Sequence, residues 1–481
     1  RAVIITTGTF LKGLIHIGDL SYSSGRAGEP SADGLSGNLQ ELGFEIKRLK
    51  TGTPPRINAN SIDFSVMSIQ PGDEPPKPFS YSTDKITQSQ VPCYLTYTNE
   101  TTHRIIQDNL SKSAMYSGRI VGIGPRYCPS IEAKVVRFPD KNEHQLFLEP
   151  EGRNTKEFYI NGLSMSLPEN IQLEVLHSIT GLEKAEMMRP AYAIEYDFAP
   201  PLQIKPTLET KLIENLYFAG QINGTSGYEE AGAQGIMAGI NAILKIRNEE
   251  PFILERSEAY IGVLIDDLVT KGTEEPYRMF TSQAEHRLIL REDNTDIRLM
   301  KYGRQFGLIS DEVYTKFEKK MRQIDEEIER LRNTRIIPNA EIQEKIRDMG
   351  TAEILNPFTL YDLLKRPEIT YNELKTLVPV PDSIMADVIE QVEIQVKYEG
   401  YIRREWSQVR QNQNLESWKI PQNIDYNIHG LSMEAREKLA KVRPFSLGQA
   451  SRISGVTPAD ISVLMVMLTQ IRQKMDSKID D

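Results

Sequence analysis

Several features that define whole classes of protein are missing from this sequence. Its 481 residues include two cysteines, Cys93 and Cys128, which excludes a disulfide framework and a four-cysteine zinc site and is typical of a reducing compartment. The six histidines stand singly, without the spacing of metal ligands, so we expect no metal site. No stretch approaches the ~20 consecutive apolar residues of a membrane-spanning helix, so we expect no membrane association.

An excess of positive charge is missing as well. The formal net charge is −10, so the molecule as a whole is not predicted to bind nucleic acid. The balance is uneven, because residues 391–481 hold 13 Lys and Arg against 11 Asp and Glu and the remainder therefore carries −12. A locally basic end can still contact RNA, since phosphates respond to the local field.

A complete G-x-G-x-x-G fingerprint for dinucleotide binding is also absent. Gly122 and Gly124 begin such a motif, but Tyr127 stands where the third glycine belongs. The sequence starts with Arg1, and residues 2–7 have the pattern of a buried parallel strand. We therefore expect the sequence to be a fragment whose fingerprint precedes its first residue.

The composition of the sequence and its pattern of apolar residues change along the chain. Its length predicts more than one domain. Residues 1–52 and 201–246 have the sequence pattern of alternating strands and helices, and we expect them to form two parts of one nucleotide-binding domain. Residues 53–200 combine many prolines with short strand-like runs, which is typical of an inserted α+β domain. Helical patterns with charged faces then dominate, and we divide them into domains 247–400 and 401–481.

Glycines mark a candidate cofactor site at two expected strand ends. Gly8 and Gly220 each follow an apolar run, and ligands of doubly wound sheets bind outside the carboxyl ends of the strands. In the next helix, Gly232, Gly235 and Gly239 share one face, where each costs about 0.5–1 kcal/mol relative to alanine. This indicates that a ligand approaches the backbone closely, although close packing of the helix on a sheet explains the pattern equally well.

Several long segments together carry a resemblance to a known family. They include GTFLKGLIHIG at 8–18, SGRAGEPS at 24–31, LKTGTPPRI at 49–57, GIGPRYCPSIEAKVVRF at 122–138, FAGQINGTSGYEEA at 218–231, EPYRMFTSQAEHRL at 275–288 and GQASRISGVTPADI at 448–461. The chain resembles, from its first residue nearly to its last, the MnmG family, also called GidA, of transfer RNA (tRNA) uridine 5-carboxymethylaminomethyl modification enzymes.

The resemblance implies a fold and a reaction. The fold is an α/β FAD-binding domain of the glutathione-reductase-like type, an inserted α+β NAD-binding-like domain and an all-α C-terminal region. The reaction adds an aminomethyl or carboxymethylaminomethyl group to carbon 5 of the wobble uridine of tRNA, using FAD, NADH, methylenetetrahydrofolate as one-carbon donor, and glycine or ammonium. The implied partners are tRNA and the GTPase MnmE, in a homodimer that forms a heterotetramer with MnmE. The implied compartment is the bacterial cytoplasm, or the mitochondrion for a eukaryotic source.

The resemblance also assigns roles to residues. Ser31 and Gln221 match flavin-contacting positions. Together with the strand-end glycines Gly8 and Gly220 they make up the expected FAD site. Cys128 matches a cysteine proposed to be catalytic, and a second family cysteine belongs to the expected missing segment. The segment that matches NAD binding comprises Gly124, Pro125, Arg126, Tyr127, Cys128, Pro129, Ser130, Ile131, Glu132, Ala133, Lys134, Val135, Val136, Arg137 and Phe138.

The chemistry of the uridine gives Cys128 a role. Carbon 5 of uracil is a poor nucleophile until a group adds to carbon 6 or removes a proton, and a thiolate can do either. Arg126 and Lys134 are close in sequence, and neighbouring cations lower the pKa of a thiol. The alternative interpretation is a small, inert, buried side chain.

Two basic groups are candidate tRNA contacts. The first comprises Arg278, Arg287 and Arg291, of which the last two would share a face if the segment is helical; ion pairs with Glu285 and Glu292 are the alternative. The second, looser group surrounds an expected helix–turn–helix near the C-terminus, which could bind a nucleic-acid backbone or a partner protein. Its members are Lys438, Arg443 and Arg452.

Two other functions remain open. A folate- and FAD-dependent tRNA uridine methyltransferase has a similar flavin domain, but that family lacks a long helical tail such as the one from about residue 252 onward. The second alternative is a non-catalytic fragment that binds RNA or a GTPase.

Overall fold

The computed structural model describes residues 1–127, 129–379, 384–421 and 423–476, and it divides into two compact units. Unit 1 comprises Arg1–Ile253 and Leu264–Met279, and unit 2 comprises Leu254–Val263 and Phe280–Asp481. Helix α6 (Tyr260–Lys271) has residues in both units. The five expected domains, 1–52, 53–200, 201–246, 247–400 and 401–481, stay predictions.

A short parallel pair of strands opens unit 1. Strand β1 (Val3–Ile5) pairs with β12 (Leu216–Phe218) over three residues. The parallel arrangement agrees with the expectation, but the expected burial is wrong, because Val3 is 59% and Ile4 is 37% exposed. Among the described residues β12 is the one strand that pairs with β1, so one edge of β1 is open.

Two antiparallel sheets form the rest of the β structure of unit 1. The four-stranded sheet has the order β3 (Leu20–Ser23), β2 (Leu14–Ile17), β11 (Tyr192–Phe198) and β4 (Lys47–Thr53). The six-stranded sheet has the order β10 (Met187–Arg189), β5 (Arg56–Asn58), β9 (Glu157–Asn161), β8 (Gln145–Pro150), β7 (Cys93–Tyr97) and β6 (Ser68–Gln70). Every strand of the second sheet lies between Thr53 and Tyr192, which face each other across β4 and β11, so the chain leaves and returns at one place.

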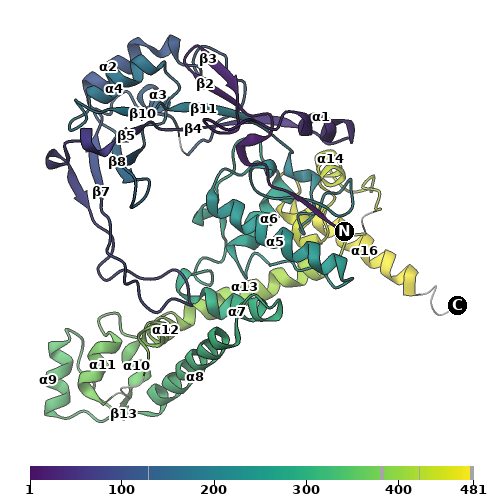
Figure 1. Ribbon diagram of the computed structural model, residues 1–481. Helices are drawn as coiled ribbons and strands as arrows, with labels where there is room; N and C mark the ends of the chain where they lie inside the picture. Colours follow the sequence, from purple (N-terminus) through teal and green to yellow (C-terminus); the bar gives the residue numbers. More distant parts are fainter. Residues whose placement is uncertain (128, 380–383, 422, 477–481) are drawn as a thin grey trace. The chain divides into compact units, whose positions relative to one another are not determined.

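The helices of unit 1 pack against these sheets. They are α1 (Gly34–Glu41), α2 (Glu100–Asp108), α3 (Ile131–Arg137), α4 (Glu169–His177) and α5 (Tyr228–Ile246). Figure 1 shows α2, α3 and α4 grouped beside the six-stranded sheet. One apolar core joins them, with Ile106 of α2, Ile131 of α3 and Leu146 of β8 fully buried. These helices and the six-stranded sheet therefore share one core.

Unit 2 is helical, as expected. Its helices are α7 (Thr295–Gln305), α8 (Asp311–Asn333), α9 (Ala340–Asp348), α10 (Leu360–Leu364), α11 (Tyr371–Leu377), α12 (Ala386–Lys397), α13 (Glu399–Ser417), α14 (Met433–Val442), α15 (Leu447–Arg452) and α16 (Pro458–Asp476). It is not entirely α, because β13 (Arg335–Ile336) pairs with β14 (Phe358–Thr359). The side chains of α8, α10 and α12 form its main apolar core, in which Ile324, Leu363 and Val388 are buried.

A single carboxylate ties together the starts of two C-terminal helices. Asp460, 3% exposed, accepts hydrogen bonds from the backbone N–H groups of Ser432 and Thr457, both at 2.9 Å. The Thr457 hydroxyl accepts from the N–H of Asp460 in return, which is the reciprocal pattern of a capping box. The hydrogen bonds from Ser432 and Thr457 lower the pKa of Asp460 from 3.8 to about 2.

Protonation of Asp460 at low pH is therefore expected to destabilise the starts of these two helices. Because the pKa is lower in the folded protein, the stabilisation is fully present above about pH 4 and is lost as the pH falls through about 2. Replacing Asp460 by alanine should lower the free energy of unfolding at pH 7 by about 1–2 kcal/mol. Urea unfolding followed by Trp418 fluorescence measures it, with exposed Glu437→Ala as control. Identical pH slopes in Asp460→Ala and the unchanged protein would contradict the assignment.

Candidate functional site

The two strand-end glycines meet at one edge of unit 1. Because β1 and β12 are parallel, their carboxyl ends lie side by side, and the N–H of Ala219 donates to the carbonyl of Ile5 at 3.1 Å. Gly8 follows β1 with φ +56°, and Gly220 follows β12 with φ +85°, backbone conformations that favour glycine. A Cβ atom at Gly8 would stand 3.5 Å from Oε1 of Gln221, so the two expected flavin positions are neighbours.

The loop that carries Ser31 joins the same edge. The N–H of Ala32 donates to the carbonyl of Phe10 at 2.8 Å, directly after the turn at Gly8. The Ser31 hydroxyl lies 2.5 Å from that of Ser23 and also bonds to Asp33. The tertiary structure therefore brings Gly8, Ser31 and the loop of Gln221 together, although more than 180 residues separate them along the chain.

Gln234 holds this edge in place, and no pattern in the sequence had singled it out. Its fully buried side chain accepts from the N–H of Gly220 at 3.2 Å and from Asn223 at 2.8 Å. It donates to the Thr225 hydroxyl and to the carbonyl of Glu230, both at 3.0 Å. The one available signal was its position in AGAQG, where a long amide stands among the alanines and glycines of an expected helix. All four hydrogen bonds are made within α5 and the loop before it, so Gln234 is a positioning residue.

The glycine face of α5 is open. At Gly232, Gly235 and Gly239 an added Cβ atom would meet nothing within 4 Å. The alternative explanation for these glycines, close packing of the helix on a sheet, therefore finds no support in the described chain.

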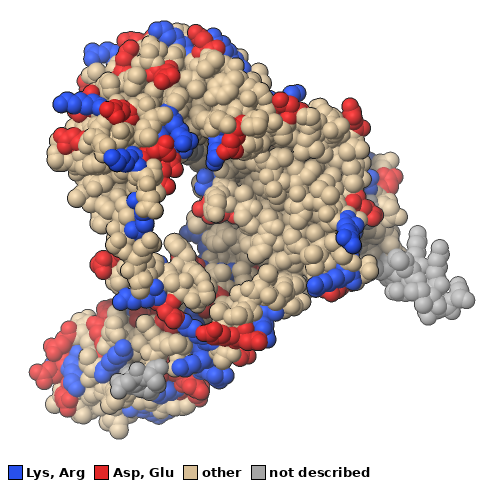
Figure 2. Space-filling view, viewed as in Figure 1, with Lys and Arg blue, Asp and Glu red and all other residues tan. Residues whose placement is uncertain are grey.

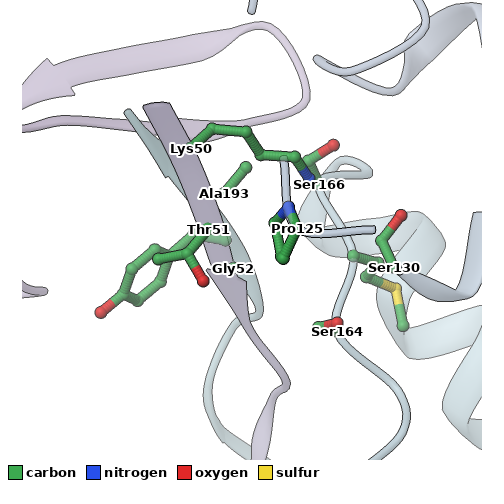
Figure 3. Close-up of a pocket in the computed structure, with 10 residues that line it drawn as sticks. Lys50, Thr51, Gly52, Pro125, Ser130, Ser164, Ser166 and Ala193 are labelled. Atoms are coloured by element: carbon green, nitrogen blue, oxygen red, sulfur yellow. The ribbon is translucent and has the colours of Figure 1, made fainter. Parts of the chain in front are cut away.

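The segment matched to NAD binding borders a small cavity, which Figure 3 shows. Pro125 and Ser130 line it together with Lys50 of β4 and Ser166. Its volume of about 20 Å³ is roughly that of one water molecule. The Ser130 hydroxyl caps α3 by accepting from the N–H of Ala133. Residue 128, the expected catalytic cysteine, lies outside the described residues, so the geometry of its thiol stays a prediction.

A buried carboxylate anchors the start of this segment. Glu195 of β11 is 2% exposed and accepts from the N–H groups of Val121 at 2.9 Å and Gly122 at 2.7 Å. Its other oxygen lies 2.9 Å from Nε2 of His16 on β2. Burial by itself raises the pKa of Glu195, but these hydrogen bonds and the charge of Arg48 outweigh it and lower the pKa below 4.5. The four-stranded sheet thus fixes where the glycines of VGIGPRY run.

The first basic group is not one helical face, which corrects that expectation. Around it the chain forms turns and the short helix η7 (Thr281–Gln283), not an α-helix. Arg278 belongs to unit 1, where its guanidinium lies 3.3 Å from Glu230, whereas Arg287 and Arg291 belong to unit 2. Arg291 contacts Asp293 at 3.0 Å.

One of the two alternative ion-pair partners of this group, Glu285, contacts an arginine outside the group. Glu285 pairs with Arg256 instead, at 2.9 Å. Arg287 is exposed and forms no ion pair within the described residues. Arg287 is therefore the member of the group with its charge available to a phosphate.

The members of the second basic group differ in exposure and in ion pairing. Lys438 on α14 is exposed, and so is Arg443, which ends α14 with φ +51°. Arg452 on α15 instead pairs with Glu416 of α13 at 2.6 Å. Because Lys438 is exposed and Arg452 is ion-paired, Lys438 is the better of these two candidates for contact with RNA.

Neither a metal-holding group of side chains nor a membrane-spanning helix is found in the described part of the chain. No group of three or more His, Cys, Asp or Glu side chains in the described part of the chain is placed to hold a metal ion. Within the same residues, no helix combines the length and the apolar character needed to cross a membrane.

The fold and the edge at Gly8 and Gly220 define a class of protein with an α/β unit and a helical C-terminal region. Comparison with family models narrows the class. Residues 1–250 match the model described as glucose inhibited division protein A. Residues 311–406 match the tRNA modifying enzyme MnmG/GidA C-terminal helical domain, and residues 408–480 match the MnmG/GidA C-terminal helical bundle. The chain therefore belongs to the MnmG/GidA family.

Individual relatives give the same result. The chain is 59% identical over 473 residues to the tRNA uridine 5-carboxymethylaminomethyl modification enzyme MnmG of Geobacillus kaustophilus, covering 98% of this chain and 75% of that protein. It is 58% identical over 471 residues to the MnmG of Bacillus cereus ATCC 14579, with the same coverage. A crystal structure of Aquifex aeolicus GidA superposes with a TM-score of 0.87 at 47% identity, over 97% of this chain and 75% of that one.

Proposed function

We propose that the protein is a tRNA uridine 5-carboxymethylaminomethyl modification enzyme. It adds an aminomethyl or carboxymethylaminomethyl group to carbon 5 of the wobble uridine, with methylenetetrahydrofolate as one-carbon donor and glycine or ammonium as nitrogen source. The match at 59% identity over 98% of the chain carries this proposal. The edge at Gly8 and Gly220 supports it, since a modification of this kind needs a bound redox cofactor.

The residues at that edge fit FAD. The hydroxyl of Thr7 and the side-chain oxygen of Asn223 are buried there without a hydrogen-bond partner in the described structure. Helix α5 begins at Tyr228, and the N-terminus of a helix favours a pyrophosphate. The open glycine face of α5 lets a flat group approach the backbone, as in a glutathione-reductase-like domain. FAD supplies hydride transfer when bound, while Ser31 and Gln221 would contact and orient it.

Residues 124–138 would hold NADH as the reductant. The anchoring of Val121 and Gly122 by Glu195 places this segment at a set position beside β4. Cys128 is assigned the catalytic thiolate that activates the uracil ring. A GTPase of the MnmE type is the proposed partner of a homodimer, forming a heterotetramer, and the bacterial relatives support a cytoplasmic setting.

Nucleoside analysis tests the proposed function. The encoding gene is expressed in a bacterial strain that lacks its own enzyme of this kind, and the tRNA nucleosides are analysed by mass spectrometry. Return of aminomethyl-type wobble uridines is expected. Appearance of 5-methyluridine instead would identify a methyltransferase. Unmodified wobble uridine together with a colourless purified protein would leave a non-catalytic RNA- or GTPase-binding chain.

Substitution of Gln234 is expected to weaken flavin binding. Leucine at this position removes the acceptor for the Gly220 N–H and the donor to Thr225, leaving buried polar groups unpaired. We expect FAD to bind roughly tenfold more weakly to Gln234→Leu, because one lost buried hydrogen bond is worth about 1–3 kcal/mol. Flavin fluorescence quenching measures the affinity, and Gln343→Leu in unit 2 is the matched control. Unchanged FAD affinity in a folded Gln234→Leu protein would refute the positioning role.

A further inference from the structure

A second candidate ligand site lies in unit 2. Helices α7, α8, α10, α12 and α13 enclose a cavity of about 420 Å³, all of whose lining residues belong to the described part of that unit. Sites for small ligands have volumes of roughly 300–1,000 Å³. The cavity is thus large enough for a small molecule and too small for a partner helix.

One wall of the cavity is apolar and carries a partly exposed indole. The lining includes Ile297 of α7, Ile328 of α8, and Ile402 and Trp406 of α13. Ile402 and Trp406 are four residues apart, so they share a face of α13. The ring of Trp406 keeps 42% of its surface exposed. A flat aromatic group can therefore lie against this wall and stack on the indole.

Two arginines, Arg332 and Arg403, line the cavity together with Glu399, a carboxylate that both contact. Glu399 of α13 lies 3.1 Å from Lys365, 3.1 Å from Arg403 and 3.8 Å from Arg332. Within the described residues, Glu399 is the carboxylate with which Arg332 and Arg403 form ion pairs, and the two are 49% and 75% exposed. Arg332 also lies over the ring of Tyr361, 4.7 Å from its centre. Lys365 also lies 3.6 Å from Asp362, so these three cations share two carboxylates and one positive charge remains for an anion.

A buried acceptor completes the lining. Gln391 of α12 is 2% exposed and donates through Nε2 to a carboxylate oxygen of Asp293 at 2.6 Å. Its oxygen Oε1 has no hydrogen-bond partner in the described structure. Buried acceptors without a donor are rare, and a bound water molecule or ligand is one explanation for such an atom. A ring or amino N–H, directly or through a water molecule, would satisfy it.

We propose that this cavity binds one nucleotide, with the base against Trp406 and the phosphate between Arg332 and Arg403. Base stacking on an aromatic side chain is worth about 1–3 kcal/mol, and arginine is well suited to a phosphate. The nucleotide can be free or part of an RNA chain; in the second case the inference rests on the proposed function and adds an RNA contact in unit 2. Figure 2 shows basic and acidic side chains interleaved over unit 2 on the face in view, so RNA binding there depends on local clusters such as this one.

The two tryptophans of the chain, Trp406 and Trp418, make a direct test possible. In a full-length Trp418→Phe protein, Trp406 is the one remaining indole. Uridine and guanosine 5′-monophosphate and a ten-nucleotide single-stranded RNA are titrated separately while its fluorescence is followed. Saturable quenching is expected, with the affinity reduced roughly tenfold by Arg403→Gln. For the RNA, the same substitution should lower the slope of log affinity against log salt by about 0.7. Arg347→Gln, an exposed cation of α9, is the matched control.

The outcomes separate the sources and the two proposals. Quenching by mononucleotides and RNA indicates a site for a free nucleotide unit, and quenching by RNA alone assigns the site to the RNA chain. No saturable quenching, or quenching that Arg332→Gln and Arg403→Gln leave unchanged, overturns the inference. Wobble-uridine modification in the Trp418→Phe strain is measured in parallel. If the wobble uridine is modified but no quenching is seen, the nucleotide site is refuted and the proposed function stands. If quenching is seen but the wobble uridine stays unmodified, the nucleotide site stands and the proposed function is refuted.

Discussion

Replacing Lys320 by methionine is expected to destabilise the helical unit by about 3–5 kcal/mol, because it removes one partner of a buried ion pair. Lys320 of α8 is 5% exposed, and its ammonium lies 2.8 Å from Asp296 of α7 and 3.3 Å from Asp387 of α12. Burial alone lowers the pKa of Lys320, but the hydrogen bond and charge of Asp296, with the charge of Asp387, outweigh it and raise the pKa above 10.5. The variant leaves the carboxylate of Asp296, 4% exposed, without the ammonium group that lies against it here.

Urea unfolding of the full chain at pH 7 measures this loss, and two variants control it. Lys319→Met changes an exposed neighbour and should stay within about 0.5 kcal/mol of the unchanged protein. The double variant Lys320→Met with Asp296→Leu should recover most of the stability, because a buried ion pair can often be replaced by apolar side chains at little cost. If Lys320→Met and Lys319→Met unfold alike, the ion pair does not hold the three helices together.

Replacing Cys128 by serine is expected to abolish most tRNA modification, by roughly 100-fold or more, while leaving flavin binding intact. A serine hydroxyl stays protonated near neutral pH, whereas a thiol beside cations ionises readily. Arg126 stands two residues before Cys128, and its guanidinium lies 5.8 Å from the centre of the Tyr127 ring. The rate of modification in vitro and the flavin absorbance of the same preparation measure the two effects separately.

Cys93→Ser is the matched control for that experiment. Cys93 of β7 is half-buried, and burial, with the nearby charge of Glu149, raises the pKa of its thiol. Its thiolate is therefore scarce at pH 7, and its replacement should leave the modification rate within about twofold. Near-normal wobble-uridine levels in Cys128→Ser would remove the catalytic role and favour the inert buried thiol. A loss in both variants would indicate a structural effect.

Much of the fold was predictable, because its signals are local. The apolar runs that end at Gly8 and Gly220 are strands, and the charged periodicity after residue 250 is helical. The short strand-like runs of residues 53–200 include the six strands of one antiparallel sheet, whereas the bounds of that domain stay a prediction. The prediction failed for residues 2–7, whose apolar sequence indicated burial, because burial depends on the neighbours of a strand as well as on its composition.

The candidate site was predictable only in part. Ser31 and Gln221 were assigned through the family resemblance and Gly8 from its place at an expected strand end, and the structure brings their loops to one edge. Gln234 was missed, since a buried amide has no sequence signature apart from its hydrogen-bond partners. The helical face assigned to Arg287 and Arg291 was wrong, because turns at residues 284–291 override the four-residue spacing.

By itself, the sequence determined the family of this protein, the change from an α/β pattern to a helical pattern along the chain, and the glycines that end two strands. These properties reside in consecutive residues, so they can be read without knowing which segments meet. Only the tertiary structure decided that β1 and β12 pair in parallel, that Gln234 holds Gly220, and that Trp406 and Arg332 line one cavity. Each of these depends on contacts between residues far apart in sequence, and such contacts follow from the packing of whole elements rather than from local pattern.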